Sequence, residues 1–413
     1  MSLEHLRIDV QRLLARLDAL AQIGPIDGGG CCRLALTDED RRGRDLVVSW
    51  MHELGLAVQV DAIGNVFGFR AGRHDTAPVM TGSHIDTVRT GGRYDGNLGV
   101  LGGLKVVQTL NDAGVATDRP LVVAFFTDEE GARFAPDMLG SLVYVGGLSL
   151  DEALDLRAAD GARLGDELLR IGYAGPAPMG VHRPAAFVEL HIEQGPVLDA
   201  DGGVIGAVQD LQGISWQELT ITGQSNHAGT TPMRLRHDAG YAAAAVASFV
   251  RELTREMGGA QVGTVGRVEL HPNLINVIAA RATLTVDLRN TDEAMLKHAE
   301  NRLAEFLDRL ARDEGVTVSA RRLARFEPVV FDPAVVQCIE TVARRLGHAP
   351  RRMTSGAGHD AQMLARVCPA AMVFVPSVNG ISHNAAEHTD PAHLAAGADV
   401  LLHTILTLSR LEN

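Results

Sequence analysis

Residues 81–100, TGSHIDTVRTGGRYDGNLGV, place His84, Asp86 and Asp95 in a glycine-rich stretch directly after an apolar, strand-like run. In an α/β sheet, ligands bind at the carboxyl ends of strands. A histidine at such a position can bind a metal ion through one ring nitrogen while a neighbouring carboxylate such as Asp86 holds the other. The alternative is a plain turn, in which Asp95 and Gly96 only supply loop geometry. His84 and Asp95 are therefore candidate metal ligands.

Three further apolar runs end in side chains of the same kinds. Glu129 and Glu130 follow LVVAFFTD, where one could bind a cation while the other transfers a proton, or both could simply favour a helix N-terminus. His191 lies in VELHIEQG and His383 in NGISHNAAEHTD, and either histidine by itself is more typical of a structural role. Together, however, the four strand ends supply the ligands that two divalent ions bridged by a carboxylate require. The sequence thus favours a dinuclear hydrolase site.

The composition limits the class of protein and its partners. At 413 residues the chain exceeds the usual size of one core, so we expect two domains, with one large α/β domain as the alternative. A formal charge of −13 argues against binding to nucleic acid or an anionic membrane and favours a small-molecule partner. The charged N-terminal segment predicts a surface helix rather than a signal peptide, and apolar runs such as PLVVAFF and AAMVFV are far shorter than the roughly 20 residues of a membrane span. Four cysteines without a CxxC pair predict free thiols and a cytoplasmic protein.

The expected elements before residue 212 alternate between strands and helices. This alternation favours a largely parallel sheet with helices on both faces. After residue 330 the same style returns, so we expect that segment to complete the sheet. The expected strands are 56–72, 78–86, 120–131, 185–195 and 370–377, and the expected helices are 4–22, 38–54, 97–113, 149–170, 333–347 and 391–411.

Residues 213–329 follow a different pattern. Their strands and helices are expected in the order β-α-β-β-α-β, which is that of a ferredoxin-like unit. We therefore expect an α/β protein in which residues 1–212 and 330–413 form the metal-binding catalytic domain and residues 213–329 form an inserted domain. The expected strands of the insert are 214–223, 260–272, 277–290 and 316–324, and its helices are 236–258 and 291–315.

Seven segments, in order along nearly the whole chain, resemble the hydantoinase/carbamoylase amidases. This branch of the M20 metallopeptidase family contains N-carbamoyl-L-amino-acid hydrolases, β-ureidopropionases and allantoate amidohydrolases. The resemblance implies a dinuclear-metal exopeptidase-like catalytic domain, with the ferredoxin-like insert as the lid and dimerisation domain of a homodimer. The segments are TGSHIDTVRTGGRYDGNLGVLGGL, FFTDEEGARF, ELHIEQGPVL, QSNHAGTTPMRLRHDA, PNLINVIAARATLTVDLRN, SGAGHDAQMLA and VPSVNGISHNAAEHT.

The resemblance also implies how the candidate residues act. Glu129 would be the general base that takes a proton from the attacking water and passes it to the leaving nitrogen, and Asp86 would orient the ring of His84. Two divalent ions are implied, with Zn²⁺ first and Mn²⁺, Co²⁺ or Ni²⁺ as alternatives that suit the same ligands. The implied ligands are His84, Asp95 and His191 for one ion, and Asp95, Glu130 and His383 for the other.

The insert gains a purpose from the same resemblance. His227 would stabilise the developing oxyanion, and Asn276 and Arg289 would bind the substrate carboxylate, partly from across the dimer. Gln194 and the backbone around Gly358 would be further substrate contacts. Without the resemblance, His227 is a loop histidine and Arg289 a surface arginine at a strand end.

The implied reaction is hydrolysis of the carbamoyl C–N bond of an N-carbamoyl-L-amino acid, or of a β-ureido acid, to the free amino acid, CO₂ and ammonia. The allantoate-cleaving branch typically has a basic residue at Ser215-Trp216, so Trp216 disfavours allantoate. The alternatives are an allantoate amidohydrolase and an M20 aminopeptidase or dipeptidase. A non-catalytic relative would lack a ligand or the base, whereas all these positions are filled. One departure from the family pattern is Asp128, where many relatives carry Asn.

Overall fold

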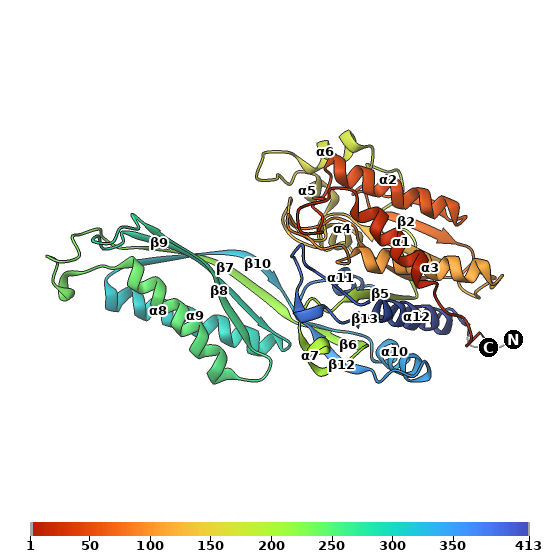
Figure 1. Ribbon diagram of the computed structural model, residues 1–413. Coiled ribbons are helices and arrows are strands. Elements are labelled where there is room, and N and C mark those ends of the chain that lie inside the picture. Colours follow the sequence, from red (N-terminus) through yellow and green to blue (C-terminus); the bar gives the residue numbers. More distant parts are fainter. Residues whose placement is uncertain (1–2, 412–413) are drawn as a thin grey trace. The chain divides into compact units, whose positions relative to one another are not determined.

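In the computed structural model, which describes residues 3–411, the chain forms two compact units (Figure 1). Unit 1 contains the described residues up to Gln209 and those from Val330 onward, and unit 2 is Asp210–Val329. Unit 2 begins slightly before the expected position at Gly213, because that position is the start of its first strand and the residues leading into the strand also belong to the unit.

The nine-stranded sheet of unit 1 is parallel at its centre, where β3 pairs with β4 and β5, and β5 pairs with β13. The pairs β1–β2, β2–β4 and β6–β13 are antiparallel. The prediction of a largely parallel sheet is therefore wrong at the edges, because a short link such as 61–65 cannot make the crossover that parallel strands need. The order is β1 (Ala57–Val60), β2 (Val66–Arg70), β4 (Leu121–Phe126), β3 (Val79–His84), β5 (Ala186–Ile192), β13 (Ala370–Val375), β6 (Gly206–Leu211) and β11 (Val329–Val330), with β12 (Arg351–Ser355) beside β6.

The central strands β3, β4, β5 and β13 are buried at every position, as expected for parallel strands covered by helices on both faces. β13 lies between β5 and β6, so the segment after residue 330 completes the sheet, as predicted. The helices of unit 1 are α1 (Val10–Ala21), α2 (Asp38–Glu53), α3 (Asn97–Asp112), α4 (Leu139–Tyr144), α5 (Leu150–Leu154), α6 (Leu164–Ile171), α7 (Val197–Asp201), α10 (Pro333–Arg345), α11 (Asp360–Leu364) and α12 (Pro391–Leu408).

Two predicted helices differ from the observed ones. The first helix begins at Val10 rather than near residue 4, because the Asp9 side chain accepts the N–H of Arg12 and caps it there. The predicted helix 149–170 is two helices, α5 and α6. They are separated by a turn in which Ala158 N–H donates to Ala162 and Gly161 has φ of 87°, a left-handed conformation that ends a helix.

Among the described residues, one helix, α12, is long and apolar enough to cross a membrane, with a mean hydropathy of 1.2 over 18 residues. Of this stretch, 61% is buried inside the protein, and the helix contacts α3, α10 and β13. Its hydrophobicity is therefore that of a core helix of unit 1.

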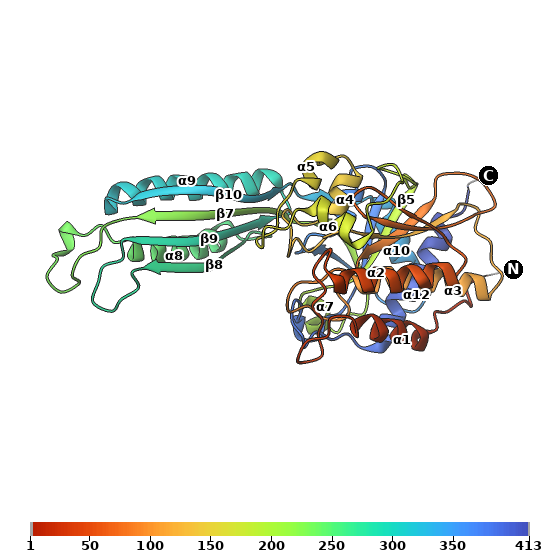
Figure 2. The ribbon, with the colours of Figure 1, turned by 90° about the horizontal axis from the view of Figure 1, so that it is seen from above.

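Unit 2 has a four-stranded antiparallel sheet in the order β10, β7, β9, β8, with helices α8 and α9 running along it (Figure 2). Side chains of both helices and of the sheet form one apolar core that includes Leu219, Leu284 and Leu303. The element order is the one predicted from the sequence: β7 (Gly213–Thr222), α8 (Ala239–Met257), β8 (Val262–His271), β9 (Arg281–Asn290), α9 (Glu293–Glu314) and β10 (Thr317–Phe326).

Candidate metal centre

The candidate ligands meet at one edge of the unit 1 sheet. His84 ends β3, Glu129 and Glu130 follow the end of β4, and His191 is the next-to-last residue of β5. His383 follows β13. Because these four neighbouring strands are parallel, their carboxyl ends lie at the same edge, which brings residues from distant parts of the chain together.

The first ligand group consists of His84, Asp95 and His191, and all three side chains are almost completely buried. Nε2 of His84 and Nε2 of His191 lie 3.7 and 3.2 Å from Oδ1 of Asp95. Nδ1 of each ring donates a hydrogen bond to a backbone carbonyl, that of Asp86 for His84 and that of Ile192 for His191. A carbonyl only accepts, so Nδ1 carries the proton and Nε2 offers its lone pair to the centre of the group.

The second ligand group consists of Asp95, Glu130 and His383. Nε2 of His383 lies 3.4 Å from Oδ2 of Asp95 and 3.3 Å from Oε2 of Glu130. The two oxygens of Asp95 therefore face different groups, which is the arrangement of a bridging carboxylate. The second group is more open than the first, because the side chain of His383 is 51% exposed.

The carboxyl groups of Glu129 and Glu130 are buried close to other acidic side chains, which disfavours their ionised forms. Burial raises the pKa of Glu130 well above its usual range, and the neighbouring Asp95 raises it further. Burial likewise raises the pKa of Glu129, which His84 opposes and Asp360 reinforces. A bound cation would offset the cost of ionising these buried carboxyl groups. The nitrogen and oxygen donors fit divalent ions such as Zn²⁺ or Mn²⁺. The residues present therefore fit a pair of metal ions.

Glu129 lies directly beside the ligands without being one of the two groups. Its Oε2 is 3.3 Å from Nε2 of His84, and the residue is 7% exposed. The side chain of Asp86 holds this segment, because its two oxygens accept the N–H groups of Glu129 and Glu130, each at 3.3 Å. Asp86 thus orients the ring of His84 through its backbone carbonyl. Its carboxylate, which was expected to hold the ring, lies 4.0 Å from Nδ1 of His84 and instead binds the N–H groups of Glu129 and Glu130.

Asp128, the departure from the family pattern, is completely buried next to these residues. Burial and the nearby charge of Asp86 raise its pKa well above the usual range. A raised pKa favours the neutral form of the carboxyl group, which is close to asparagine in shape and charge.

Two of the predicted substrate contacts lie in unit 1. Nε2 of Gln194 donates to Oδ2 of Asp95 at 2.9 Å, so Gln194 lies at the metal centre. Gly358 immediately precedes His359 and α11, and a Cβ on it would lie 2.9 Å from the end of the Met138 side chain.

The other predicted contacts lie in unit 2, as two separate pairs. Arg289 forms an ion pair with Asp287 at 2.9 Å, and its guanidinium lies 5.8 Å from the centre of the Trp216 ring. His227 and Asn276 lie on adjacent loops, since Ala228 N–H donates to the carbonyl of Asn276. Nδ1 of His227 accepts N–H groups of residues 229 and 230, so the ring proton is on Nε2 and is available for donation.

Several buried residues around the centre were missed by the sequence analysis. His359 lies against His191 with ring centres 4.5 Å apart, and together with Glu189 these residues form a third group of possible ligands. The oxygens of Glu189 already accept Ser83 Oγ and Ala361 N–H, which makes a structural role better suited to it. Glu387 accepts N–H groups of the Asp95 turn. A carboxylate within five residues of His383 was the available signal, but the sequence does not show where it points.

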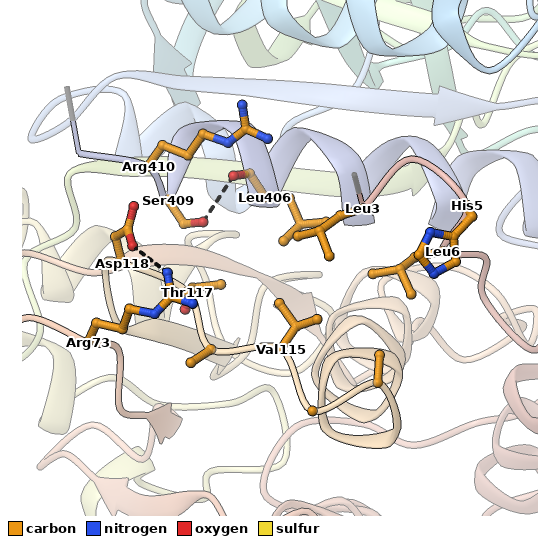
Figure 3. Close-up of a pocket in the computed structure, with 13 residues that line it drawn as sticks. Leu3, His5, Leu6, Arg73, Val115, Thr117, Asp118, Leu406, Ser409 and Arg410 are labelled. Carbon is orange, nitrogen blue, oxygen red and sulfur yellow. Dashed lines mark hydrogen bonds and ion pairs between the residues drawn. The ribbon is translucent and has the colours of Figure 1, made fainter. Parts of the chain in front are cut away.

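A separate groove of about 550 Å³ lies at the other end of the strands (Figure 3). It is lined by residues near the start of the chain, by the segment 113–118 that precedes β4, and by the end of α12. Its Arg73 and Asp118 pair with each other at 3.1 Å. The lining segment 113–118 precedes β4, whereas Glu129 and Glu130 follow that strand, so the groove is remote from the metal centre.

The comparisons with known proteins agree with this geometry. The model of peptidase family M20/M25/M40 matches residues 80–407. The chain is 43% identical to an N-carbamoyl-L-amino-acid amidohydrolase of Rhizobium meliloti, over 98% of this chain and 97% of that protein. It is 41% identical to one of Geobacillus stearothermophilus, over 98% and 100%. A crystal structure of a hydantoinase/carbamoylase family amidase from Burkholderia multivorans superposes with a TM-score of 0.93 at 48% identity, covering 98% of both chains.

Less similar relatives have other names. An allantoate amidohydrolase of Escherichia coli is 35% identical over 95% of this chain and 96% of that protein. A ureidoglycolate hydrolase of Arabidopsis thaliana is 34% identical over 98% of this chain and 87% of that protein.

The turn after Asp95 gives a first testable prediction. Gly96 has φ of 63°, and a Cβ there would lie 2.4 Å from Nε2 and Cε1 of His84. We expect Gly96→Ala to displace His84 and weaken binding of one metal ion about 10- to 100-fold, measured by dialysis and elemental analysis.

The matched control is Gly114→Ala, because Gly114 has the same φ of 63° with nothing within 4 Å of the added Cβ. The two variants share the backbone strain, so equal metal binding in both would contradict the role assigned to Gly96.

Proposed function

Since the chain belongs to peptidase family M20/M25/M40 and is a hydrolase of the N-carbamoyl-L-amino-acid amidohydrolase type, we propose that it cleaves the carbamoyl C–N bond of N-carbamoyl-L-amino acids or β-ureido acids. The products are the free amino acid and carbamate, which decomposes to CO₂ and ammonia. The observation that carries this proposal is Asp95, whose two oxygens face two groups of ligands.

Two divalent ions would be held by His84, Asp95 and His191, and by Asp95, Glu130 and His383. When bound, they would polarise the carbamoyl carbonyl and lower the pKa of water, which would supply hydroxide for attack on that carbonyl near neutral pH. Zn²⁺ is our first choice, and Mn²⁺, Co²⁺ and Ni²⁺ suit the same donors.

Glu129 is proposed as the general base. It lies 3.3 Å from a ligand nitrogen, so its carboxylate is within reach of water at the centre. Burial raises its pKa, which lets it hold the proton taken from water until the leaving nitrogen accepts it. Donation of that proton to nitrogen turns the leaving group into a neutral amine.

The insert is proposed to act as a lid that completes the site. Nε2 of His227 is a free donor for the oxyanion, and Asn276 and Arg289 suit the substrate carboxylate. Gln194 and the backbone at Gly358 would complete the contacts.

The two pairs in unit 2 cannot reach the same substrate molecule from one copy of the chain. Arg289 pairs with Ile214, at the end of the sheet where the chain enters and leaves the unit. His227 follows the end of β7 and Asn276 precedes the start of β9, so both lie near the opposite end of the sheet, at the Thr222–Arg281 pair. The eight residue steps from Ile214 to Thr222 span about 26 Å, more than the length of a carbamoyl amino acid. We therefore propose that Arg289 acts within its own subunit and His227 in the partner's site.

A homodimer through unit 2 follows from this proposal. β8 is at the end of the sheet order, and its outer edge pairs with no strand among the described residues. An open edge of this kind is a template for a strand of a second copy. We further propose a cytoplasmic location, with which the four free thiols agree.

Trp216 supports a simple carbamoyl substrate over allantoate. The uncharged indole lies against Arg289, where a second ureido group would gain from a further polar or basic partner. The relatives of Rhizobium meliloti and Geobacillus stearothermophilus described above, at 43% and 41% identity, are both N-carbamoyl-L-amino-acid amidohydrolases.

A substrate panel tests this choice. We expect hydrolysis of N-carbamoyl-L-amino acids, with loss of activity after chelation and recovery with Zn²⁺, Mn²⁺, Co²⁺ or Ni²⁺, measured by ammonia release. The N-carbamoyl-D-amino acids serve as controls. Turnover of dipeptides or allantoate alone would rule out the proposed substrate.

The role of Glu129 is tested with Glu129→Gln, which keeps the shape of the side chain but cannot accept the proton. We expect kcat to fall about 10²–10⁴-fold while the protein still binds two metal ions. Near-normal turnover would exclude Glu129 as the base.

Mixed dimers test which subunit supplies each group. Co-expression of Glu129→Gln with His227→Ala chains gives mixed dimers with one complete site, so random pairing should restore about a quarter of wild-type activity. The matched pair, Glu129→Gln with Arg289→Ala, should restore none, because Arg289 acts in its own subunit. Recovery in the second mixture but not in the first would reverse the assignment.

A further inference from the structure

The loop that carries His383 is fastened to the loop that carries Asp95 by side chains outside the two ligand groups. Oε1 of Glu387 accepts the backbone N–H groups of Tyr94 and Asp95, at 3.0 and 3.2 Å. Its Oε2 accepts the hydroxyl of Ser382 at 3.2 Å. From the other loop, Oγ1 of Thr90 donates to the carbonyl of His383 at 2.9 Å. Two chain segments almost 300 residues apart thus share hydrogen bonds at both ends of the contact.

The Glu387 carboxylate is built into this contact. The residue is 5% exposed, and among the described residues no lysine or arginine forms an ion pair with it. Hydrogen bonds to N–H and O–H groups therefore stabilise it in place of a countercharge. A Cβ on Gly92 would overlap the carboxylate, so the side chain reaches the Asp95 turn only because Gly92 has none.

The contact matters most for the second ligand group. His84 and His191 are 1% exposed and each is held by a ring hydrogen bond to a backbone carbonyl. His383 is 51% exposed and stands in a left-handed conformation with φ of 52°. Its distance from Asp95 therefore depends on how firmly the two loops are joined.

We propose that Glu387 is a positioning residue that holds Asp95 and His383 at the spacing required by the second, more exposed metal ion. Glu387 is not itself a ligand, because its oxygens are directed to the backbone of the Asp95 turn and to Ser382. The inference rests on the proposed dinuclear site and assigns unequal retention to its two ions: the buried ion is held independently of Glu387, and the exposed ion is not.

The test is titration of metal-free protein with Zn²⁺ alone, followed by calorimetry and elemental analysis after dialysis. Wild type is expected to bind two ions. Glu387→Ala is expected to keep one ion at unchanged affinity and to bind the other about 10- to 100-fold more weakly. Glu387→Gln keeps the bulk of the side chain and one oxygen for the N–H groups of the turn, so it should weaken the exposed ion less than Glu387→Ala does. A role limited to bulk packing predicts instead that Glu387→Gln binds both ions as wild type does.

The matched control is Glu340→Ala. Glu340 is also 5% exposed, but it pairs with Arg352 at 3.0 Å, away from the metal centre. This variant should lose stability without losing either ion. If Glu387→Ala does not fold, Glu387→Gln and Thr90→Val carry the test, because each weakens the same contact more mildly.

Two results would overturn the inference: equal affinity of wild type and the folded Glu387 variants for both ions, or equal weakening of both ions. A wild-type protein that binds a single ion would overturn it together with the dinuclear site. A protein that binds two ions but hydrolyses no carbamoyl amino acid would overturn the proposed substrate, whereas selective loss of one ion would still support the role of Glu387.

Discussion

The carboxylate of Asp95 is the group on which the rest of the site depends. It is buried, and each of its oxygens faces a different set of ligands. Burial alone would raise the pKa of Asp95, but the neighbouring His191 and His84 outweigh this effect and hold it well below the usual range. A carboxylate that stays ionised at this position is a suitable bridge between two cations. The features around it, from Gly96 to Gln194, serve to keep it there.

The fold supplies the site by a simple geometric rule. Four adjacent parallel strands end at one edge, and the candidate ligands lie at these strand ends or in the loops that follow them. The strands are buried on both faces, so their ends are fixed by the core. Arg33 joins the two ends of the loop between β3 and α3, because its guanidinium donates to the carbonyl of Ile85 and to the side chain of Asn97. Positions that flank His84 and Asp95 are thereby held by one buried side chain.

Unit 2 has a different physical role. Its core is formed by one face of a sheet and two helices, and the sheet is about 26 Å long between the Ile214–Arg289 and Thr222–Arg281 pairs. A length of this order separates Arg289 from the loop of His227. The proposed dimer turns this separation into a function, since each copy can serve its own site with one end and the partner's site with the other.

The sequence by itself determined the ligand types, the strand ends that carry them and the βαββαβ order of the insert, because apolar runs and their periodicity are local properties. The tertiary structure decided what depends on long-range contacts: which strands pair at the edges of the sheet, and the actual hydrogen bonds of Asp86. Glu387 shows the difference most clearly. It is one of several acidic residues in the sequence, and its role appears only when folding places it against a turn almost 300 positions away.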